Sequence, residues 1–348
     1  MEYSKKKVAI ITLSREFNHG AFLQSYNLKR FIEDKYGYEV FFVDVFNKYF
    51  HLKKAILVTL RERSFFASGF LKILTYIKLQ KKLNYINLKD FTKDIHKFDY
   101  LVFGSDEIWN LSLNKNFLFF GGSFIYKDYQ KIISYAASFG STSYLKPDIK
   151  KELIQRLSKF HFISARDVNT QKILKEELNF DSNLVVDPTL LNYKYDKELL
   201  NKNTYSHPKK YLLVYGVKFD NDILKDILYF SKKYNLEIVT MVYSHKFAHI
   251  NLVNVDINDF INLIIGSKIF FTNMFHGTLY AVKYSSNFCF NYSSYRKNKF
   301  SHISNIFELN SNKHSLNKKN IIEYKNKSKK FMSVISKTSM KFIQNCFK

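Results

Sequence analysis

The sequence predicts an α/β protein made of two doubly wound domains with mainly parallel strands. Short apolar runs, which are typical of buried strands, alternate along the chain with segments of helical period. In addition, a chain of 348 residues with 46% hydrophobic residues can bury a large core, and at that length a chain usually divides into two domains. We therefore expect two facing Rossmann-like domains.

The first domain is expected to span residues 1–191. Its strands are predicted where apolar residues run together, and its helices where apolar residues recur every three or four positions. Gly37 is expected to end the first helix, because glycine tolerates the left-handed conformation found there. In chain order the elements are the strand Val8–Leu13, the helix Ala21–Tyr36, the strands Tyr38–Val45, Tyr100–Phe103 and Ile132–Ala137, the helix Pro147–Phe160 and the strand Phe162–Ala165.

A polar stretch, residues 192–210, predicts the domain linker, and the second domain follows at residues 211–312. Ligands of such open sheets bind beyond the carboxyl ends of the strands, so we expect the functional site there. The predicted elements are the strand Tyr211–Val217, the helix Asp222–Tyr234, the strand Glu237–Val242, the helix Asp256–Ile265, the strand Lys268–Phe271, the helix Gly277–Tyr284 and the strand Phe288–Phe290.

Two basic segments interrupt this pattern: an insertion at residues 46–95 and a helical tail at residues 313–348. Both space lysines among large apolar side chains, and Glu62 is the only acidic residue from Phe46 to Leu88. Two interpretations stay open. The segments are ordinary amphipathic helices packed on the domains, or they lie against the anionic inner face of the cytoplasmic membrane.

The net charge of +25 favours a polyanionic neighbour, which could be a nucleic acid, an anionic lipid or a phosphorylated substrate. Cys289 and Cys346 are the only cysteines, which argues against a disulfide framework and a cysteine zinc site, and we expect no metal. No window approaches the roughly 18 consecutive apolar residues of a spanning helix. We expect a cytoplasmic protein, with peripheral membrane association as the open question.

The most informative stretch for chemistry is Ile269–Val282, in which an apolar strand ends in Thr272-Asn273-Met274-Phe275-His276-Gly277 before a helix. The free backbone N–H groups at the start of a helix suit a phosphate or a carboxylate. His276 is therefore a candidate acid beside an anion site. The alternative is a buried structural histidine.

Six short motifs lie in order at predicted strand ends. They are Asn18, Gly20, Ala21 and Gln24; Gly104–Asn110; Ser134–Gly140; Ser164–Asp167; Asp187–Leu190; and Phe275–Thr278. Together they resemble the polysaccharide pyruvyl transferase family over about residues 8–310. The resemblance implies a fold similar to the GT-B glycosyltransferase architecture, with the acceptor bound mainly by the first domain and the donor by the second.

The same resemblance implies transfer of the enolpyruvyl unit of phosphoenolpyruvate, as a ketal, onto two hydroxyls of a sugar. The sugar belongs to a cell-surface polysaccharide or its lipid-linked precursor, and phosphoenolpyruvate is the co-substrate without a further cofactor. The donor's methylene must be protonated, for which His276 is the natural candidate. Arg166 matches the arginine of the family's Ser-x-Arg-Glu motif and offers bidentate geometry for the donor's anionic groups.

A basic residue is expected about twenty positions beyond the histidine. Lys299 is the first choice, Arg296 and Lys297 are rivals, and each is alternatively a surface charge. Asp106 is assigned to catalysis together with His276 and Arg166. Asp106 and Asn110 are expected to hydrogen-bond acceptor hydroxyls or to activate one as a base, and the alternative is an aspartate that caps a helix. The remaining predicted substrate-binding residues, whose turns either approach substrate or are merely tight, are Asn18, Gly20, Asn273, Gly277 and Thr278.

Asp187-Pro188 is assigned no chemistry, and Trp109 is taken as a core residue in preference to a sugar-stacking platform. Two other functions stay open. The first is a glycosyltransferase using a nucleotide sugar, with His276 and the basic cluster holding a diphosphate. The second is a nucleic-acid-binding protein, which is disfavoured because the cations concentrate in two segments and no recognised nucleic-acid motif is present.

Overall fold

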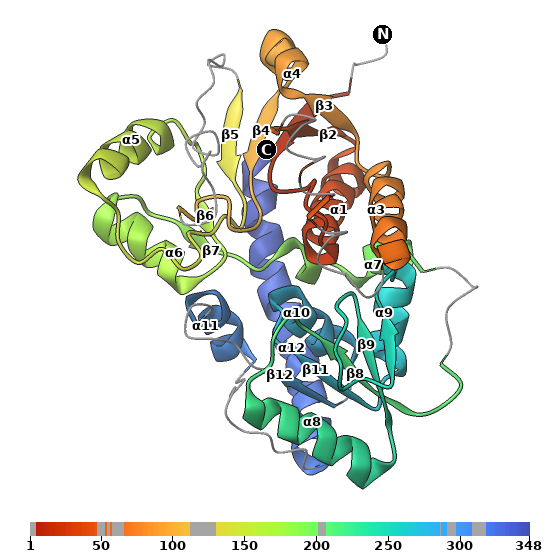
Figure 1. Ribbon diagram of the computed structural model, residues 1–348. Coiled ribbons are helices and arrows are strands. Elements are labelled where there is room, and N and C mark those ends of the chain that lie inside the picture. The colour runs from red at the N-terminus through yellow and green to blue at the C-terminus, as the bar shows by residue number, and fades with distance from the viewer. Residues whose placement is uncertain are drawn as a thin grey trace.

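The computed structural model describes residues 5–46, 53, 56–57, 66–111, 130–200, 207–285, 287–290, 297–307 and 318–348. Its two five-stranded sheets form two domains, with helices packed against them and one long helix running past both (Figure 1). Every strand pairing in both sheets is parallel. The predicted α/β class with two Rossmann-like domains is confirmed.

The first sheet has the order β3-β2-β1-β4-β5. Because the chain reverses its direction of winding between β1 and β4, the carboxyl ends of these two central strands flank the place where doubly wound folds bind ligands. The strands are buried apolar runs, except for the short β3. They are β1 (Lys7–Ile11), β2 (Glu39–Asp44), β3 (Tyr85–Asn87), β4 (Tyr100–Phe103) and β5 (Lys131–Ser134).

The main helices of the first domain are α1 (His19–Tyr36), α3 (Phe66–Gln80), α4 (Leu88–Asp94), α5 (Pro147–Leu157) and α6 (Val168–Lys172). Helix α1 ends at Gly37, whose φ of 66° places it in the left-handed region, as the sequence predicts. Its first turn is capped by Asn18, whose side-chain oxygen accepts a hydrogen bond from the Gly20 amide at 2.8 Å.

The predicted strand Phe162–Ala165 is not a full member of this sheet. Only β6 (Ser164–Ala165) is a strand, and it pairs with β7 (Asn183–Leu184) in a separate two-stranded sheet. Isolated bridges join Ile133 to Phe162 and Ala137 to Ala165. The segment is buried, as its apolar run predicts, but hydrogen bonds from serine side chains take the place of part of the backbone pairing between strands. The side chains of Ser134 and Ser164 each form hydrogen bonds with the backbone of the other residue, at 2.8–3.1 Å.

The second sheet repeats the order of the first, as β10-β9-β8-β11-β12. Its strands are β8 (Tyr211–Tyr215), β9 (Glu237–Met241), β10 (Ile250–Leu252), β11 (Ile269–Thr272) and β12 (Phe288–Phe290), and its helices are α8 (Asn221–Tyr234), α9 (Ile257–Gly266), α10 (Phe275–Tyr284) and α11 (Lys297–Ile306). The edge strands β3 and β10 were not predicted, whereas the equally short edge strand β12 was predicted at Phe288–Phe290 from its apolar residues.

The described part of the linker, residues 192–200, is not a solvated spacer. It contains α7 (Tyr193–Lys197), on which Asp196 is fully buried. Asp196 accepts hydrogen bonds from the ammonium group of Lys283 and from Tyr280 and Tyr284 on α10. The polar composition of the linker suggested exposure to solvent. Instead, Asp196 and Lys283 are buried as a pair of opposite charges, and their contact joins the linker to the second domain.

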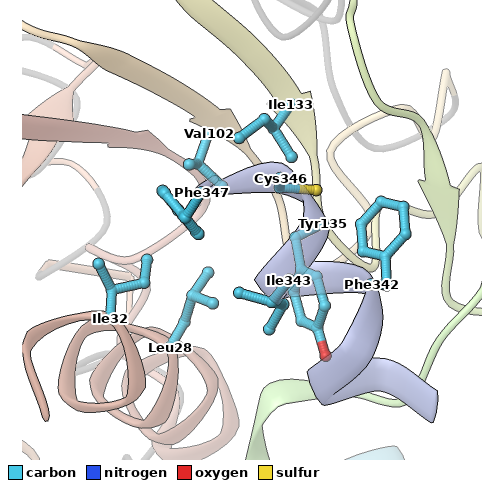
Figure 2. A pocket seen from close by; sticks show the side chains of 9 residues that line it. All are labelled: Leu28, Ile32, Val102, Ile133, Tyr135, Phe342, Ile343, Cys346 and Phe347. Atoms are coloured by element: carbon cyan, nitrogen blue, oxygen red, sulfur yellow. The ribbon is translucent and has the colours of Figure 1, made fainter. Parts of the chain in front are cut away.

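The long helix α12 (Lys318–Cys346) begins beside the second domain and ends in the first (Figure 1). Its last turns pack between α1 and the first sheet, as Figure 2 shows. A cavity of about 10 Å³ remains there, which is no more than room for one water molecule. It is lined by Leu28, Ile32, Val102, Ile133, Tyr135, Phe342, Ile343, Cys346 and Phe347.

The end of the C-terminal tail thus packs on the first domain. This is what the interpretation of the tail as an ordinary amphipathic helix predicts. Phe342, Ile343 and Phe347 are buried, and the Ser339 hydroxyl accepts a hydrogen bond from the Val186 amide at 3.0 Å. The apolar side of this end of α12 is therefore covered by the first domain. Among the described residues, no helix is long and apolar enough to cross a membrane.

Candidate active site between the two domains

The N-termini of two helices, one from each domain, meet at Gly20 and His276. Helix α1 follows β1, and helix α10 follows β11, so both lie at carboxyl ends of central strands. A Cβ atom on Gly20 would lie 2.8 Å from Cβ of His276 and closer still to the imidazole ring. Only glycine permits this approach, so the turn at Asn18 and Gly20 brings the first domain against the candidate acid.

Asp187 contacts two of the three predicted catalytic residues, Arg166 and His276. Its Oδ2 lies 3.0 Å from Nη1 of Arg166 and 3.5 Å from Nε2 of His276. The second distance allows an ion pair but is longer than a usual hydrogen bond of about 2.7–3.2 Å. Arg166 also reaches Asp106, with Nη2 3.2 Å from Oδ1. The structure therefore brings His276, Arg166 and Asp106 into one cluster, centred on a carboxylate to which the sequence analysis gave no chemistry.

The opposite charges in this cluster stabilise the ionised forms of Asp187 and Arg166. Burial alone would raise the pKa of Asp187, but the neighbouring His276 and Arg166 lower it below the ordinary value of 3.8. Burial alone would lower the pKa of Arg166, but Asp106 and Asp187 raise it. Phe275 lies with its ring centroid 4.5 Å from the guanidinium. Arg166 is thus a buried cation with both terminal nitrogens on carboxylates.

The loop that carries Asp106 is held in an uncommon conformation. Asp106 has a φ of 84°, in a region that residues with a Cβ rarely adopt. The preceding Ser105 donates its hydroxyl to Gln24 at 2.5 Å and accepts from Thr12 through its carbonyl at 2.6 Å. Gln24 was one of the motif residues, and its contact explains how α1 fixes this loop. Backbone strain held in place by its surroundings is typical of functional sites.

Asp167, which follows Arg166, anchors the start of α6. It accepts hydrogen bonds from the Ser138 hydroxyl at 2.6 Å and the Thr170 amide at 2.8 Å. Burial raises the pKa of this carboxyl despite these donors. The Ser134–Gly140 and Ser164–Asp167 motifs are therefore joined by a direct contact, which positions the strand end that carries Arg166.

Several predicted substrate-binding residues serve the protein's own structure here. Asn110 is fully buried and donates to Glu107 at 2.7 Å. The Thr278 hydroxyl donates to the Met274 carbonyl at 3.2 Å within its own turn. Asn273 donates to the carbonyl of Lys218. Gly277 is needed for close packing, because a Cβ there would lie 2.8 Å from Tyr215. Trp109 is fully buried, as expected of a core residue.

Of the basic residues predicted beyond the histidine, Lys297 and Lys299 lie in the first turn of α11. Arg296 is outside the described residues, as are the side chains of Lys297 and Lys299. Helix α11 itself packs against α6, which follows Arg166. Its Phe300 is buried, with its ring centroid 5.6 Å from that of Phe275. The backbone of Lys297 and Lys299 is therefore tied to the elements that carry Arg166 and His276.

His19 forms a second buried bridge between the domains. Its Nε2 donates to the Val255 carbonyl at 2.7 Å, and its Nδ1 accepts from the Tyr76 hydroxyl at 2.7 Å. The ring stacks on Phe260 with centroids 5.0 Å apart. Burial lowers the pKa of His19 to about 3, so the ring is neutral at physiological pH. Its position directly before Gly20 helps to hold the two helix N-termini together.

A larger cavity, of about 540 Å³, lies between the linker, α10 and α12. Its surface is mainly apolar, and the buried cation at its wall, Lys283, is already bound to Asp196 and to the Thr189 carbonyl. Within the described ranges, no group of three or more His, Cys, Asp or Glu side chains could hold a metal ion. The cluster around His276 is therefore the better candidate for acid catalysis.

We expect Asp187→Asn to lower the free energy of unfolding by about 3–5 kcal/mol at pH 7, since it breaks a buried charge pair. The pKa of Asp187 is depressed in the folded state, so its stabilising contribution is complete above 3.8 and is lost as pH falls below that value. Urea unfolding of both proteins at pH 7, 5 and 3 measures this, and the difference between them should shrink in acid.

The matched control for that prediction is Asp181→Asn. Asp181 pairs with Lys175 at 2.7 Å, but both side chains are largely exposed. Its removal should change stability by less than about 1 kcal/mol at every pH. A deficit for Asp187→Asn that stays the same from pH 7 to pH 3 would contradict the assigned direction of the pKa shift.

Known structures resemble this one in fold. A putative UDP-N-acetylglucosamine 2-epimerase from Listeria monocytogenes has 11% identity and a TM-score of 0.50, with 95% of this chain and 91% of that chain covered. The UDP-GlcNAc 2-epimerase from Neisseria meningitidis has 11% identity and a TM-score of 0.50, with 98% and 100% covered. The glycosyltransferase SnogD from Streptomyces nogalater has 10% identity and a TM-score of 0.44, with 99% and 100% covered.

At such low identity the likeness to the two epimerases concerns the fold alone, and it agrees with two facing Rossmann-like domains. No curated protein sequence matches the chain significantly. Residues 18–285, by contrast, match the sequence profile of the family described as polysaccharide pyruvyl transferase. That range contains the Gly20 turn, Arg166, Asp187 and His276. The chain belongs to the polysaccharide pyruvyl transferase family.

Proposed function

We propose that this protein transfers the enolpyruvyl unit of phosphoenolpyruvate to two hydroxyls of a sugar, forming a pyruvate ketal. The acceptor is a cell-surface polysaccharide or its lipid-linked precursor. One observation carries the proposal within this family: His276 stands at the start of α10, 3.5 Å from the buried carboxylate of Asp187, where the two domains meet. An imidazole beside a fixed carboxylate is suited to hold and deliver a proton.

The reaction needs one proton delivered to carbon. The imidazolium of His276 protonates the donor's methylene, which becomes the methyl group, and positive charge develops at the adjacent carbon. The two sugar oxygens bond to that carbon and phosphate leaves with the electrons of its C–O bond. Of the two hydroxyl protons released, one restores the proton to His276 and the other leaves with the phosphate. Asp187 stabilises the imidazolium and orients the ring.

Arg166 acts in this scheme as a positioning residue. The sequence suggested that its two terminal nitrogens grip the donor, but they already hold Asp106 and Asp187. A buried arginine between two carboxylates keeps Asp187 aimed at His276 and fixes the Asp106 loop on the acceptor side. The donor's carboxylate and phosphate are then left to the N–H groups of the α1 and α10 N-termini and to the basic cluster at Arg296, Lys297 and Lys299.

The test is incubation of the protein with phosphoenolpyruvate and a panel of sugar and glycolipid acceptors. Phosphate release should accompany a product whose mass equals the acceptor plus pyruvic acid minus water. A thermal-shift titration gives a second readout, because a ligand that binds only the folded state raises its melting temperature. Stabilisation by nucleotide sugars, with neither stabilisation nor phosphate release from phosphoenolpyruvate, would favour a glycosyltransferase instead.

A further inference from the structure

Helix α3 has apolar side chains on two opposite sides. On the inner side Tyr76 and Leu79 are buried, together with the stem of Lys72. On the outer side, large apolar residues recur at helical spacing, so that they form one stripe. Their exposed fractions are 56% for Phe70, 48% for Leu71, 46% for Leu74 and 46% for Ile77. A surface helix normally shows a polar side to water, so this stripe needs an explanation.

Specific contacts fix the rotation of α3 about its axis. The Tyr76 hydroxyl donates to His19 at 2.7 Å, and the Lys72 ammonium donates to the Val242 carbonyl at 2.7 Å. At the edge of the same side, the Thr75 hydroxyl donates to Asn254 at 2.9 Å. Helix α3 thus spans from the first domain to the second, and its outer stripe cannot turn inward without breaking these bonds.

The charged residues of α3 and of the turn that follows it have one sign. Lys78 follows Ile77 on the exposed side, and Lys81 and Lys82 come directly after the helix and are exposed. No aspartate or glutamate occurs from residue 66 to residue 89. The outer surface of α3 is therefore apolar and cationic, and it lies on the outside of the first domain (Figure 1).

We propose that the outer side of α3 docks onto a bilayer that contains anionic phospholipids. Phe70, Leu74 and Ile77 would enter the boundary between headgroups and acyl chains, while Lys78, Lys81 and Lys82 would contact the phosphate groups. This occupant matches both properties of the surface, because a bilayer supplies an apolar layer directly beneath a layer of negative charge. The C-terminal helix differs, since the apolar side chains of its last turns lie inside the first domain (Figure 2).

The proposal does not depend on the ketal-forming activity. It concerns a surface of the first domain, and its test requires neither donor nor acceptor. If the acceptor is lipid-linked, docking by α3 would place the enzyme at the surface where that acceptor resides. A failure to bind vesicles and a failure to release phosphate are separate results.

The test is co-sedimentation of the full chain with phosphatidylcholine vesicles that contain or lack phosphatidylglycerol. The unaltered protein should bind the anionic vesicles at least about tenfold more tightly than the neutral ones and should lose this preference in high salt. The triple variant Phe70→Gln, Leu74→Gln and Ile77→Gln should lose at least about tenfold in binding. The triple variant Lys78→Gln, Lys81→Gln and Lys82→Gln should bind both vesicle types equally weakly.

The control is the double variant Leu228→Gln and Tyr229→Gln on α8, which removes two large apolar side chains of similar fractional exposure, 46% and 56%, elsewhere on the molecule. It should bind vesicles like the unaltered protein, and melting temperatures should show that all variants fold. Equal binding of the unaltered protein to neutral vesicles would overturn the proposal. Unchanged binding by the α3 apolar variant would also overturn it. So would a dimer, detected by sedimentation velocity, that disappears only in the α3 apolar variant.

Discussion

The variant His276→Gln should release phosphate from phosphoenolpyruvate about 10²–10⁴-fold more slowly than the unaltered protein. Glutamine has a similar reach but carries no proton that it can deliver at neutral pH, so the step that forms the methyl group loses its acid. Initial rates of phosphate release at saturating donor and acceptor measure the effect. The change should appear in kcat, because proton transfer occurs in the transition state.

The fold should survive this substitution. Asp187 keeps its contact with Arg166 at 3.0 Å and its hydrogen bonds from the Thr189 amide and hydroxyl. The control is His249→Gln, since His249 accepts a hydrogen bond from the Ile238 amide at 2.9 Å at the opposite, amino-terminal edge of the second sheet. Its rate should stay normal. A His276→Gln variant that keeps the normal rate would remove His276 from the mechanism.

The variant Gly20→Ala should lose activity about 10²-fold, although it alters no group that takes part in the chemistry. The added Cβ would overlap the His276 ring, so the ring or the whole α1 N-terminus must shift. A displacement of about 1 Å at a reacting group costs roughly 10²-fold in rate. Overpacking a tight contact also costs about 1–3 kcal/mol of stability, which chemical denaturation measures.

The control variant Gly266→Ala separates the loss of activity from the loss of stability that are expected for Gly20→Ala. A Cβ on Gly266 would lie 2.8 Å from Oη of Tyr211, so this variant also overpacks the protein, but at the end of α9. It should lose stability and keep its rate per folded molecule. If Gly20→Ala behaves in the same way as Gly266→Ala, the close approach of α1 to His276 is only a packing feature.

Much of the fold follows from local pattern. The buried strands β1, β4, β8 and β11 are apolar runs, and helix α8 begins and ends within a residue of its predicted bounds. The edge strands β3 and β10 and the serine-mediated contact beside β5 escaped prediction. Their positions depend on the neighbouring chain rather than on their own composition.

The candidate site, like the fold, could be predicted only in part from local sequence. His276, Arg166 and Asp106 were named from motifs at strand ends, and the structure places them in one cluster. Asp187 was passed over because an Asp-Pro pair at a turn has an ordinary structural explanation. Nothing local indicates that its carboxylate points at a histidine of the other domain. Likewise, the bidentate geometry of arginine suggested that Arg166 binds the donor. Only the structure shows that both of its terminal nitrogens already contact Asp106 and Asp187.

Local periodicity was enough to establish the two α/β domains, the strand ends that carry polar motifs and the amphipathic character of both basic segments, because each of these depends on residues close together in the chain. Periodicity defines a face but not what covers it. The packing of whole domains decided that the end of α12 is buried while α3 keeps an apolar stripe outside. It also decided that Gly20, Asp187 and His276 meet, since their proximity depends on how the two sheets face each other.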